Sequence, residues 1–461
     1  MVVGATVRTL GAWPSGWRHP GAHRDPADDP RALRSFALTA EAAGLHFLYF
    51  GDWLSTGADF EQTDPHLLAR IEPLAAIGFL SAFTERIGLI ATVSSAHTEP
   101  YSTARSTASI DLLSNGRVGL CVASVSEPRI AANFGRTNAH PDEDRLEAAS
   151  EYIEILRGLW DSWEDRAFVA DAATGQLIDP DLLHQLAYVG RHFSSAGPLN
   201  VVRPPQGHPV ISVVGGATRA RTLAANQADI TFLAPNPLSE AIDYYRATKD
   251  HARSLGRDPD HFVLITTILP IVAETREEAW AHYDRMVELV PVETAAGVGG
   301  AVSIPANRTI RRLAGLLGVS LHGVLVDEAV PAKVAARFSP LGAELLSLVT
   351  SRSGRKVGGD RPVTYRHLLV AHAVAAPVLV GSAVDIADYM EAWFVASATD
   401  GFTILSPYLP GPFELFTSLV IPELKRRGVF PEQYAGETLR ENLGLPRPDN
   451  SFTRGARSSQ D

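Results

Sequence analysis

The segment from Ile87 to Ser124 reads IGLIATVSSAHTEPYSTARSTASIDLLSNGRVGLCVAS and shows the unit from which the fold is built. It begins with an apolar run of strand length at Ile87–Val93 and continues with a helical pattern at Tyr101–Leu113. It ends with a second apolar run at Arg117–Ser124. Runs of this kind are typical of parallel strands that are covered on both faces. The segment therefore predicts a strand–helix–strand unit.

The same alternation recurs along most of the chain. Six further runs have the length and composition of strands: Ala5–Arg8, His46–Gly51, Pro209–Val214, Asp229–Ala234, Val263–Val272 and Gly401–Ser406. Helical patterns lie between the strands: Asp29–Ala43, Glu72–Phe83, Asp144–Trp160, Leu238–Ser254, Glu277–Leu289 and Phe413–Arg427. Eight strands that alternate with helices predict an α/β fold, the (β/α)₈ TIM barrel, with an open doubly wound sheet as the alternative.

Two long segments interrupt this repeat, after the fourth and the seventh strand. Ser162–His208 is rich in Gly, Pro and Asp, with strand-like pieces at Leu186–Val189 and Leu199–Val202. Pro291–Val380 contains helical stretches, Thr309–Leu317 and Leu341–Val349. Insertions of this size usually form a lid or an oligomer contact. We expect one domain over residues 1–446 and a polar, disordered tail over 447–461.

Composition bears on partners and compartment. The 461 residues carry a formal net charge of −11, with acidic and basic residues interspersed, which disfavours nucleic acid or an anionic membrane as the main partner. A single cysteine, Cys121, excludes an internal disulfide framework and a multi-cysteine zinc site. No apolar run approaches the length of a membrane span and no signal-peptide pattern is visible, so we expect a cytoplasmic protein. The sequence shows no obvious constellation of metal ligands, so we expect no metal site.

In a barrel, the chemistry lies at the C-terminal ends of the strands. That position selects Asp52, Thr92, Ser94, His97 and Ser124, together with the turn Gly215–Thr218 and the pair Pro235–Asn236. Asp52 would face the barrel mouth or cap the next loop. His97 is the titratable candidate for proton exchange near neutral pH, and a structural histidine is the alternative. The glycine turn would bind a phosphate at a helix start or would only make a tight turn.

A series of motifs in chain order resembles the nitrilotriacetate and long-chain alkane monooxygenase branch of the bacterial luciferase superfamily. The motifs are Gly16–Pro20, Phe50–Asp52, Thr84–Thr92, Glu99–Tyr101, Asn133–Gly135, Arg157–Asp165, Gly197–Asn200, Pro205–Gly207, Asp400–Phe402 and Val420–Gly428. The resemblance implies a luciferase-like barrel that uses reduced FMN and O₂ to oxygenate a small organic or natural-product substrate. A separate NAD(P)H-dependent flavin reductase would supply the FMN, and a dimer or tetramer is usual. Asp52 and Thr92 match flavin-contacting positions of the family.

Departures from the family pattern gather where the flavin phosphate is expected. The family's His and Tyr are replaced by Asp142 and Leu146, and its Thr-Ser pair after the fourth strand begins here at Ser124. Ala217, Thr218 and Arg219 stand in its phosphate loop. A carboxylate about 4 Å from the phosphate would cost on the order of 4 kcal/mol at an effective dielectric constant near 20.

These departures predict weak FMN binding unless other side chains compensate. Arg219 would do so by pairing with the phosphate, Thr218 by replacing the lost serine hydroxyl, and His140 by a local shift of the chain. Two alternatives follow for function. One is a flavin-free, degenerate partner subunit of a heteromeric oxygenase, and the other is a related barrel with a deazaflavin or no cofactor.

Overall fold

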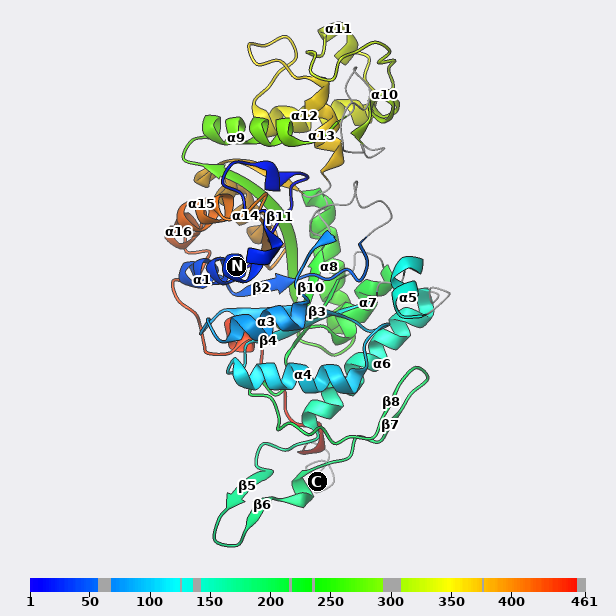
Figure 1. The fold of residues 1–461 in the computed structure, drawn as a ribbon, viewed down its shortest axis with the longest axis vertical. Coiled ribbons are helices and arrows are strands. Elements are labelled where there is room, and N and C mark those ends of the chain that lie inside the picture. The colour runs from blue at the N-terminus through cyan, green and yellow to red at the C-terminus, as the bar shows by residue number, and fades with distance from the viewer. Residues whose placement is uncertain are drawn as a thin grey trace.

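Eight parallel strands close into a barrel (Figure 1) in the computed structural model, which describes residues 1–56, 68–124, 127–135, 142–214, 218–233, 237–292, 308–374 and 377–453. The strands pair in the order β1 (Val2–Thr6), β2 (Phe47–Phe50), β3 (Gly88–Ser94), β4 (Val118–Ala123), β9 (Val210–Val214), β10 (Ile230–Leu233), β11 (Val263–Ala273) and β13 (Gly401–Leu405). Pairing of β13 with β1 and of β10 with β11 leaves no open edge in this ring. The predicted (β/α)₈ barrel is confirmed, and the doubly wound alternative is wrong.

The first strand lies about three residues earlier than predicted. Its position is fixed on both sides, because Val2 pairs with Gly401 of β13 and Gly4 pairs with Phe47 of β2. β1 therefore ends at Thr6, and Arg8, which the prediction placed inside the strand, belongs to the loop at the C-terminal end of the barrel.

Helices cover the outer face of the barrel. They are α1 (Asp29–Ala43), α3 (Pro73–Ser81), α4 (Pro100–Leu113), α5 (Pro128–Asn133), α6 (Asp142–Asp161), α7 (Thr218–Gln227), α8 (Leu238–Ser254), α9 (Arg276–Leu289), α14 (Ala383–Val395), α15 (Gly411–Leu415) and α16 (Ile421–Arg426). A π-helical turn at Phe416–Val420 joins the last two, so the predicted helix Phe413–Arg427 is present with one irregular turn. None of the helices described is long and apolar enough to cross a membrane.

The first insertion forms two small antiparallel sheets at one end of the molecule (Figure 1). One pairs β5 (Phe168–Asp171) with β6 (Gln176–Ile178), and the other pairs β7 (Tyr188–Val189) with β8 (Ser194–Ser195). The strand predicted at Leu199–Val202 is wrong. The backbone of Leu199 bonds to side chains instead, since its N–H donates to Ser162 Oγ (3.0 Å) and its carbonyl accepts from Trp163 Nε1 (2.6 Å).

The second insertion packs on α9 at the opposite end of the molecule (Figure 1). It contains α10 (Ile310–Leu317), α11 (Ala332–Ala335), α12 (Pro340–Ser353) and α13 (Tyr365–Ala373), which share an apolar cluster with α9. It ends before the predicted Val380, because β12 (Val378–Ser382) pairs in parallel with Leu269–Ala273, the second half of the long strand β11. Thus β12 extends the sheet outside the closed ring.

The C-terminal segment packs against the end of the barrel where the strands begin. The short helix α17 (Leu439–Asn442) contributes a leucine to the apolar cluster inside the barrel. Beyond it, Arg447 Nη2 lies 2.7 Å from Asp165, and Asn450 Nδ2 donates to the carbonyl of Asp161 (2.8 Å). Where a disordered tail was expected from residue 447, the chain is thus folded back as far as Thr453, because Arg447 and Asn450 bond to Asp165 and Asp161. Residues 454–461 lie outside the described part of the chain.

Candidate active site

A layer of hydroxyl and thiol groups lies inside the barrel below its C-terminal mouth. Thr92 Oγ1 donates to the hydroxyl of Tyr49 (3.2 Å), which lies 3.7 Å from Cys121 Sγ. The Tyr49 ring stacks on Phe232, with ring centroids 4.4 Å apart. Burial raises the pKa of Tyr49 well above its usual value, so the phenol is neutral. These side chains form a rigid, uncharged floor.

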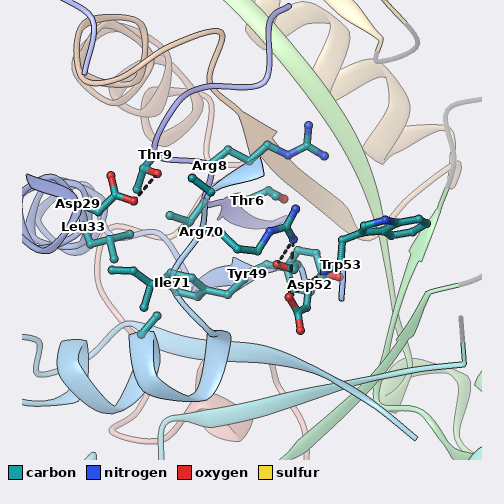
Figure 2. Close-up of a pocket in the computed structure, with 15 residues that line it drawn as sticks. Thr6, Arg8, Thr9, Asp29, Leu33, Tyr49, Asp52, Trp53, Arg70 and Ile71 are labelled. Atoms are coloured by element: carbon teal, nitrogen blue, oxygen red, sulfur yellow. Dashed lines mark hydrogen bonds and ion pairs between the residues drawn. The ribbon is translucent and has the colours of Figure 1, made fainter. Parts of the chain in front are cut away.

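Two cavities open above this layer. The larger has a volume of about 370 Å³ and lies between the loop after β1, the end of β2 and α3 (Figure 2). The smaller, of about 20 Å³, is lined by Asp52, Trp53, Leu54, Thr92, Ser94, Ala123 and Ile130. Asp52 and Trp53 belong to both linings, so the two spaces adjoin at the end of β2.

Asp52 is held at the junction of the two cavities. Its Oδ1 accepts the backbone N–H of Trp53 (2.8 Å) and lies 3.9 Å from Arg70 Nη1, which also donates to the carbonyl of Gly51 (3.1 Å). Burial raises the pKa of Asp52, although the Trp53 N–H and Arg70 oppose the rise. Asp52 thus both lines the mouth and caps the loop that follows it, which were the two expectations for this residue.

Ser94 supplies a polar atom that the described part of the protein leaves unsatisfied. Its side chain is 8% exposed, and its Oγ has no hydrogen-bond partner among the described residues. Buried polar groups are nearly always hydrogen-bonded, so an orphaned hydroxyl indicates a missing ligand or water. Ser94 lines the smaller cavity with Asp52 and Thr92. This corner of the mouth therefore presents three polar side chains to a bound molecule.

The remaining predicted residues are more dispersed. His97 is half-buried and stacks on Phe134, with ring centroids 4.4 Å apart, and its backbone N–H donates to Ser94 O (3.1 Å). Ser124 is half-buried directly after β4. Leu146 packs from α6 against the apolar cluster under β4 and β9. Among the described residues that line the two cavities, neither His97 nor Ser124 is found, so their roles stay predictions.

The residues predicted to bind the flavin phosphate stand at the starts of two helices. Asp142 is the first residue of α6, and Thr218 and Arg219 begin α7, so the helix start predicted after the fifth strand is present. The side chains of these three residues fall outside the described part of the structure, as do Ala217 and His140 entirely.

One cluster of acidic and histidine side chains has ligand atoms close enough to hold a metal ion. In the described part of the chain, Asp144, Glu147 and His192 place these atoms within 4.8 Å of one another. Arg191 already pairs with both carboxylates, at 3.2 Å from Asp144 and 2.7 Å from Glu147. The guanidinium therefore supplies the positive charge at this point.

Sequence reasoning missed most residues of the larger cavity, among them Arg8, Trp53 and Arg70. Arg8 was hidden by the shifted boundary of β1. Trp53 follows Asp52 directly, so its place at the mouth could have been found from the same rule that selected Asp52. Arg70 lies 19 residues after Gly51 in the sequence, and no short-range pattern indicates that the two are in contact.

Comparison with known proteins decides the family. Residues 12–399 match the model of the family described as Luciferase-like monooxygenase. The chain belongs to this family. The resemblance inferred from the motifs is thereby confirmed. As a member of this family, the protein is a flavin-dependent monooxygenase.

Two relatives match this luciferase-like monooxygenase over almost its whole length. N-acetyl-S-(2-succino)cysteine monooxygenase of Bacillus subtilis (strain 168) is 35% identical over 452 residues, which is 98% of each chain. Component A of nitrilotriacetate monooxygenase from Aminobacter aminovorans is 33% identical, again with 98% of each chain covered. Among solved structures, riboflavin lyase with modified FMN and riboflavin matches with a TM-score of 0.76 and 27% identity, over 97% of this chain and 96% of that one.

Proposed function

We propose that this luciferase-like monooxygenase oxygenates a small organic substrate with O₂ and reduced FMN, and that a separate NAD(P)H-dependent reductase supplies the FMN. The observation that carries the proposal is the orphaned Ser94 hydroxyl, which shares a cavity with Asp52 and Thr92 above the barrel floor. The relatives support it, since one is named as component A of a monooxygenase and a similar structure contains a modified FMN.

The residues at the mouth would hold the flavin ring by its polar edge. Ser94 Oγ would donate or accept one hydrogen bond, and Asp52 would accept from a ring N–H or, when protonated, donate to a carbonyl. Thr92 would hold the Tyr49 side chain in place below the mouth through its hydrogen bond to the Tyr49 hydroxyl. Reduced FMN supplies the two electrons that activate O₂ when it is bound. The protein contributes a preformed, largely apolar setting that limits access of water to the ring.

The phosphate end of the flavin would lie where α6 and α7 begin. We infer that it would lie beside Asp142, Leu146 and Ser124 and near the start of α7, where the phosphate loop of the sequence, Ala217, Thr218 and Arg219, would supply N–H groups, a hydroxyl and a positive charge. His97 would exchange protons near the ring. The carboxylate of Asp142 opposes a phosphate dianion, so this end determines whether FMN binding is weak or tight.

An anaerobic titration with photoreduced FMN tests the proposal directly. We expect saturable binding of reduced FMN, and O₂-dependent turnover once an NADH-driven flavin reductase is added. Ser94→Ala should weaken the binding of reduced FMN by about 3- to 10-fold, because it removes one hydrogen bond worth on the order of 1 kcal/mol. Its thermal midpoint should not fall, since the hydroxyl has no partner in the described part of the protein.

Ser106→Ala is the matched control, because Ser106 is exposed on α4 and lies away from both cavities. It should bind reduced FMN as the unmodified protein does. If the unmodified protein does not bind reduced FMN at millimolar concentration, the monooxygenase proposal is overturned for the isolated chain. A stable complex with an intact homologue would then favour the partner-subunit alternative.

A further inference from the structure

The side chains of β3 that point into the barrel become polar toward its mouth. Alternate residues of a strand share a face, so Ile90, Thr92 and Ser94 follow one another on the inner side. Ile90 belongs to the apolar cluster inside the barrel, whereas Thr92 and Ser94 line the smaller cavity. Thr92 is therefore the hydroxyl at which the floor of the barrel borders this cavity.

The hydroxyl proton of Thr92 is already bonded to a neighbouring side chain. Thr92 Oγ1 donates to the Tyr49 hydroxyl (3.2 Å), and that hydroxyl donates in turn to Cys121 Sγ (3.7 Å). Burial raises the pKa of Tyr49 well above its usual value, so the phenol keeps the proton that it donates to the thiol. A hydroxyl has one proton and two lone pairs. Thr92 thus presents lone pairs, and no proton, to a molecule in the cavity.

Ser94 is not restricted in this way. Its hydroxyl has no hydrogen-bond partner in the described part of the protein, so it can turn to donate or to accept. The two hydroxyls of the smaller cavity therefore differ in what they recognise. Ser94 suits either kind of polar atom, whereas Thr92 selects a donor.

This selection bears on the redox state of a flavin. Reduction of FMN adds an N–H group at the polar part of its ring, where the oxidised ring has a nitrogen lone pair. A hydroxyl that only accepts gains a hydrogen bond from the added N–H group. Two acceptors that meet in a buried site leave both unsatisfied, which costs free energy. An acceptor at the cavity thus favours reduced FMN over oxidised FMN.

We propose that Tyr49 is a positioning residue for the flavin, because it keeps Thr92 as a hydrogen-bond acceptor and thereby favours binding of reduced over oxidised FMN. The inference rests on the proposed use of reduced FMN and assigns a role in it to a side chain below the site. Tyr49 acts through Thr92, and its ring is held for this purpose by stacking on Phe232, with centroids 4.4 Å apart.

Anaerobic titrations with oxidised and with photoreduced FMN test the inference through the ratio of the two dissociation constants. We expect the unmodified protein to bind reduced FMN more tightly. Tyr49→Phe keeps the ring but removes the acceptor of the Thr92 proton, and a thiol is too weak an acceptor to hold that proton in its place. The preference for reduced FMN should fall by about 3- to 10-fold, the effect of one hydrogen bond. A tenfold fall lowers the midpoint potential of bound FMN by about 30 mV.

Cys121→Ala reaches the same result by another route. It removes the acceptor of the Tyr49 proton, so Tyr49 donates to Thr92 and the Thr92 proton turns toward the cavity. Cys121 is not among the described residues that line either cavity, so the change acts through the two hydroxyls. Tyr434→Phe is the matched control. It removes a phenol that donates to the carbonyl of Leu45 (2.7 Å), just before β2, and should leave the ratio unchanged.

The ratio separates a positioning role from a structural one. If Tyr49→Phe weakens the binding of both forms by the same factor, Tyr49 is only structural and the inference is overturned. Equal affinity of the unmodified protein for the two forms also overturns it, but leaves the monooxygenase proposal standing. Absence of reduced-FMN binding at millimolar concentration overturns both. If Tyr49→Phe does not fold, the ratio measured for Cys121→Ala decides.

Discussion

At the scale of single residues, Asp111 shows how a buried carboxyl group ties the folded state to pH. The side chain is fully buried in α4, where Oδ1 accepts the N–H of Val118 (3.0 Å) and Gln206 Nε2 (2.7 Å). Burial raises its pKa from the ordinary 3.8 to about 6, because the hydrogen bonds only partly offset the loss of water. The folded protein thus holds a proton on Asp111 that the unfolded chain has already released.

The sign of the pH effect follows from this difference. Between pH 4 and about 6 the folded state binds more protons at Asp111, so its contribution to stability falls as the pH rises. Asp111→Asn keeps the oxygen that accepts from Val118 and from Gln206 Nε2, and it loses only the long bond from the Gln206 backbone N–H to Oδ2 (3.5 Å). It should remove a penalty at pH 7 that is on the order of 3 kcal/mol, and the gain should vanish near pH 4.

Urea unfolding at pH 4, 5, 6 and 7 measures this gain as the difference between the variant and the unmodified protein. Asp250→Asn, at an exposed position, is the control and should show no such trend. A difference that stays constant from pH 4 to 7 would mean that Asp111 does not titrate in this range.

The candidate site shows what a sequence can indicate about single residues. Asp52, Thr92 and Ser94 lie at strand ends, so the barrel rule alone brings them to one rim, and the structure finds them lining one cavity. Arg70 could not be placed in this way, since its contact with Gly51 spans 19 residues and Arg70 does not lie at the end of a predicted strand. Side-chain burial also lies beyond pattern reasoning, as at Leu146, which is half-buried and packs against an apolar cluster.

At the scale of elements, Glu151 fastens the first insertion to the barrel. The side chain lies on α6 and accepts the backbone N–H groups of Arg191 (2.9 Å), His192 (2.9 Å) and Phe193 (3.1 Å). These three residues form the turn between β7 and β8. Burial alone would raise the pKa of Glu151, but the three donors outweigh it and hold the pKa below the usual value.

Removing this carboxylate should loosen the hairpin without unfolding the barrel. Glu151→Ala leaves three N–H groups without their acceptor, at a cost of about 1–3 kcal/mol for each group that water does not reach. We expect hydrogen exchange in residues 188–195 to become roughly 10-fold faster or more, with exchange in β3 and β4 unchanged. Glu151→Gln retains one carbonyl oxygen and should show a smaller effect. Unchanged exchange in the hairpin would show that other contacts hold it.

Elements were predicted well where a periodic apolar pattern continues long enough. All eight barrel strands and the outer helices α1 and α8 follow from such patterns. β12 and α14 were not recognised. β12 does not alternate regularly between buried and half-buried residues, and the part of β11 with which it pairs lies about 110 residues earlier in the chain. The backbone bonds of Leu199 to side chains likewise have no signal in strand propensity.

At the scale of the whole molecule, the C-terminal segment covers the end of the barrel where the strands begin. Leu439 is fully buried inside the barrel, together with Phe47 and Ile90, and Leu443 and Leu445 join the same cluster. Glycines of the strands make room for it, since a Cβ on Gly88 or Gly119 would lie 2.3 Å or 3.3 Å from a methyl carbon of Leu439. A buried ion pair between Arg440 and Asp229 (2.8 Å) fixes the segment in place.

The residues after Gly436 therefore contribute to the stability of the barrel in two separable steps. A chain that ends at Gly436 loses Leu439, Leu443 and Leu445. Loss of each buried leucine costs about 2–5 kcal/mol, so the total loss approaches the free energy of unfolding of a typical protein, about 5–15 kcal/mol. We expect it to show no cooperative thermal transition by circular dichroism. A chain that ends at Pro446 keeps the leucines and the Arg440–Asp229 pair and loses only the contacts of the segment after Pro446, including those of Asn450 with Asp161. It should unfold cooperatively at a lower temperature than the complete chain. Similar cooperative transitions in both shortened chains would show that the barrel is stable without the leucine segment.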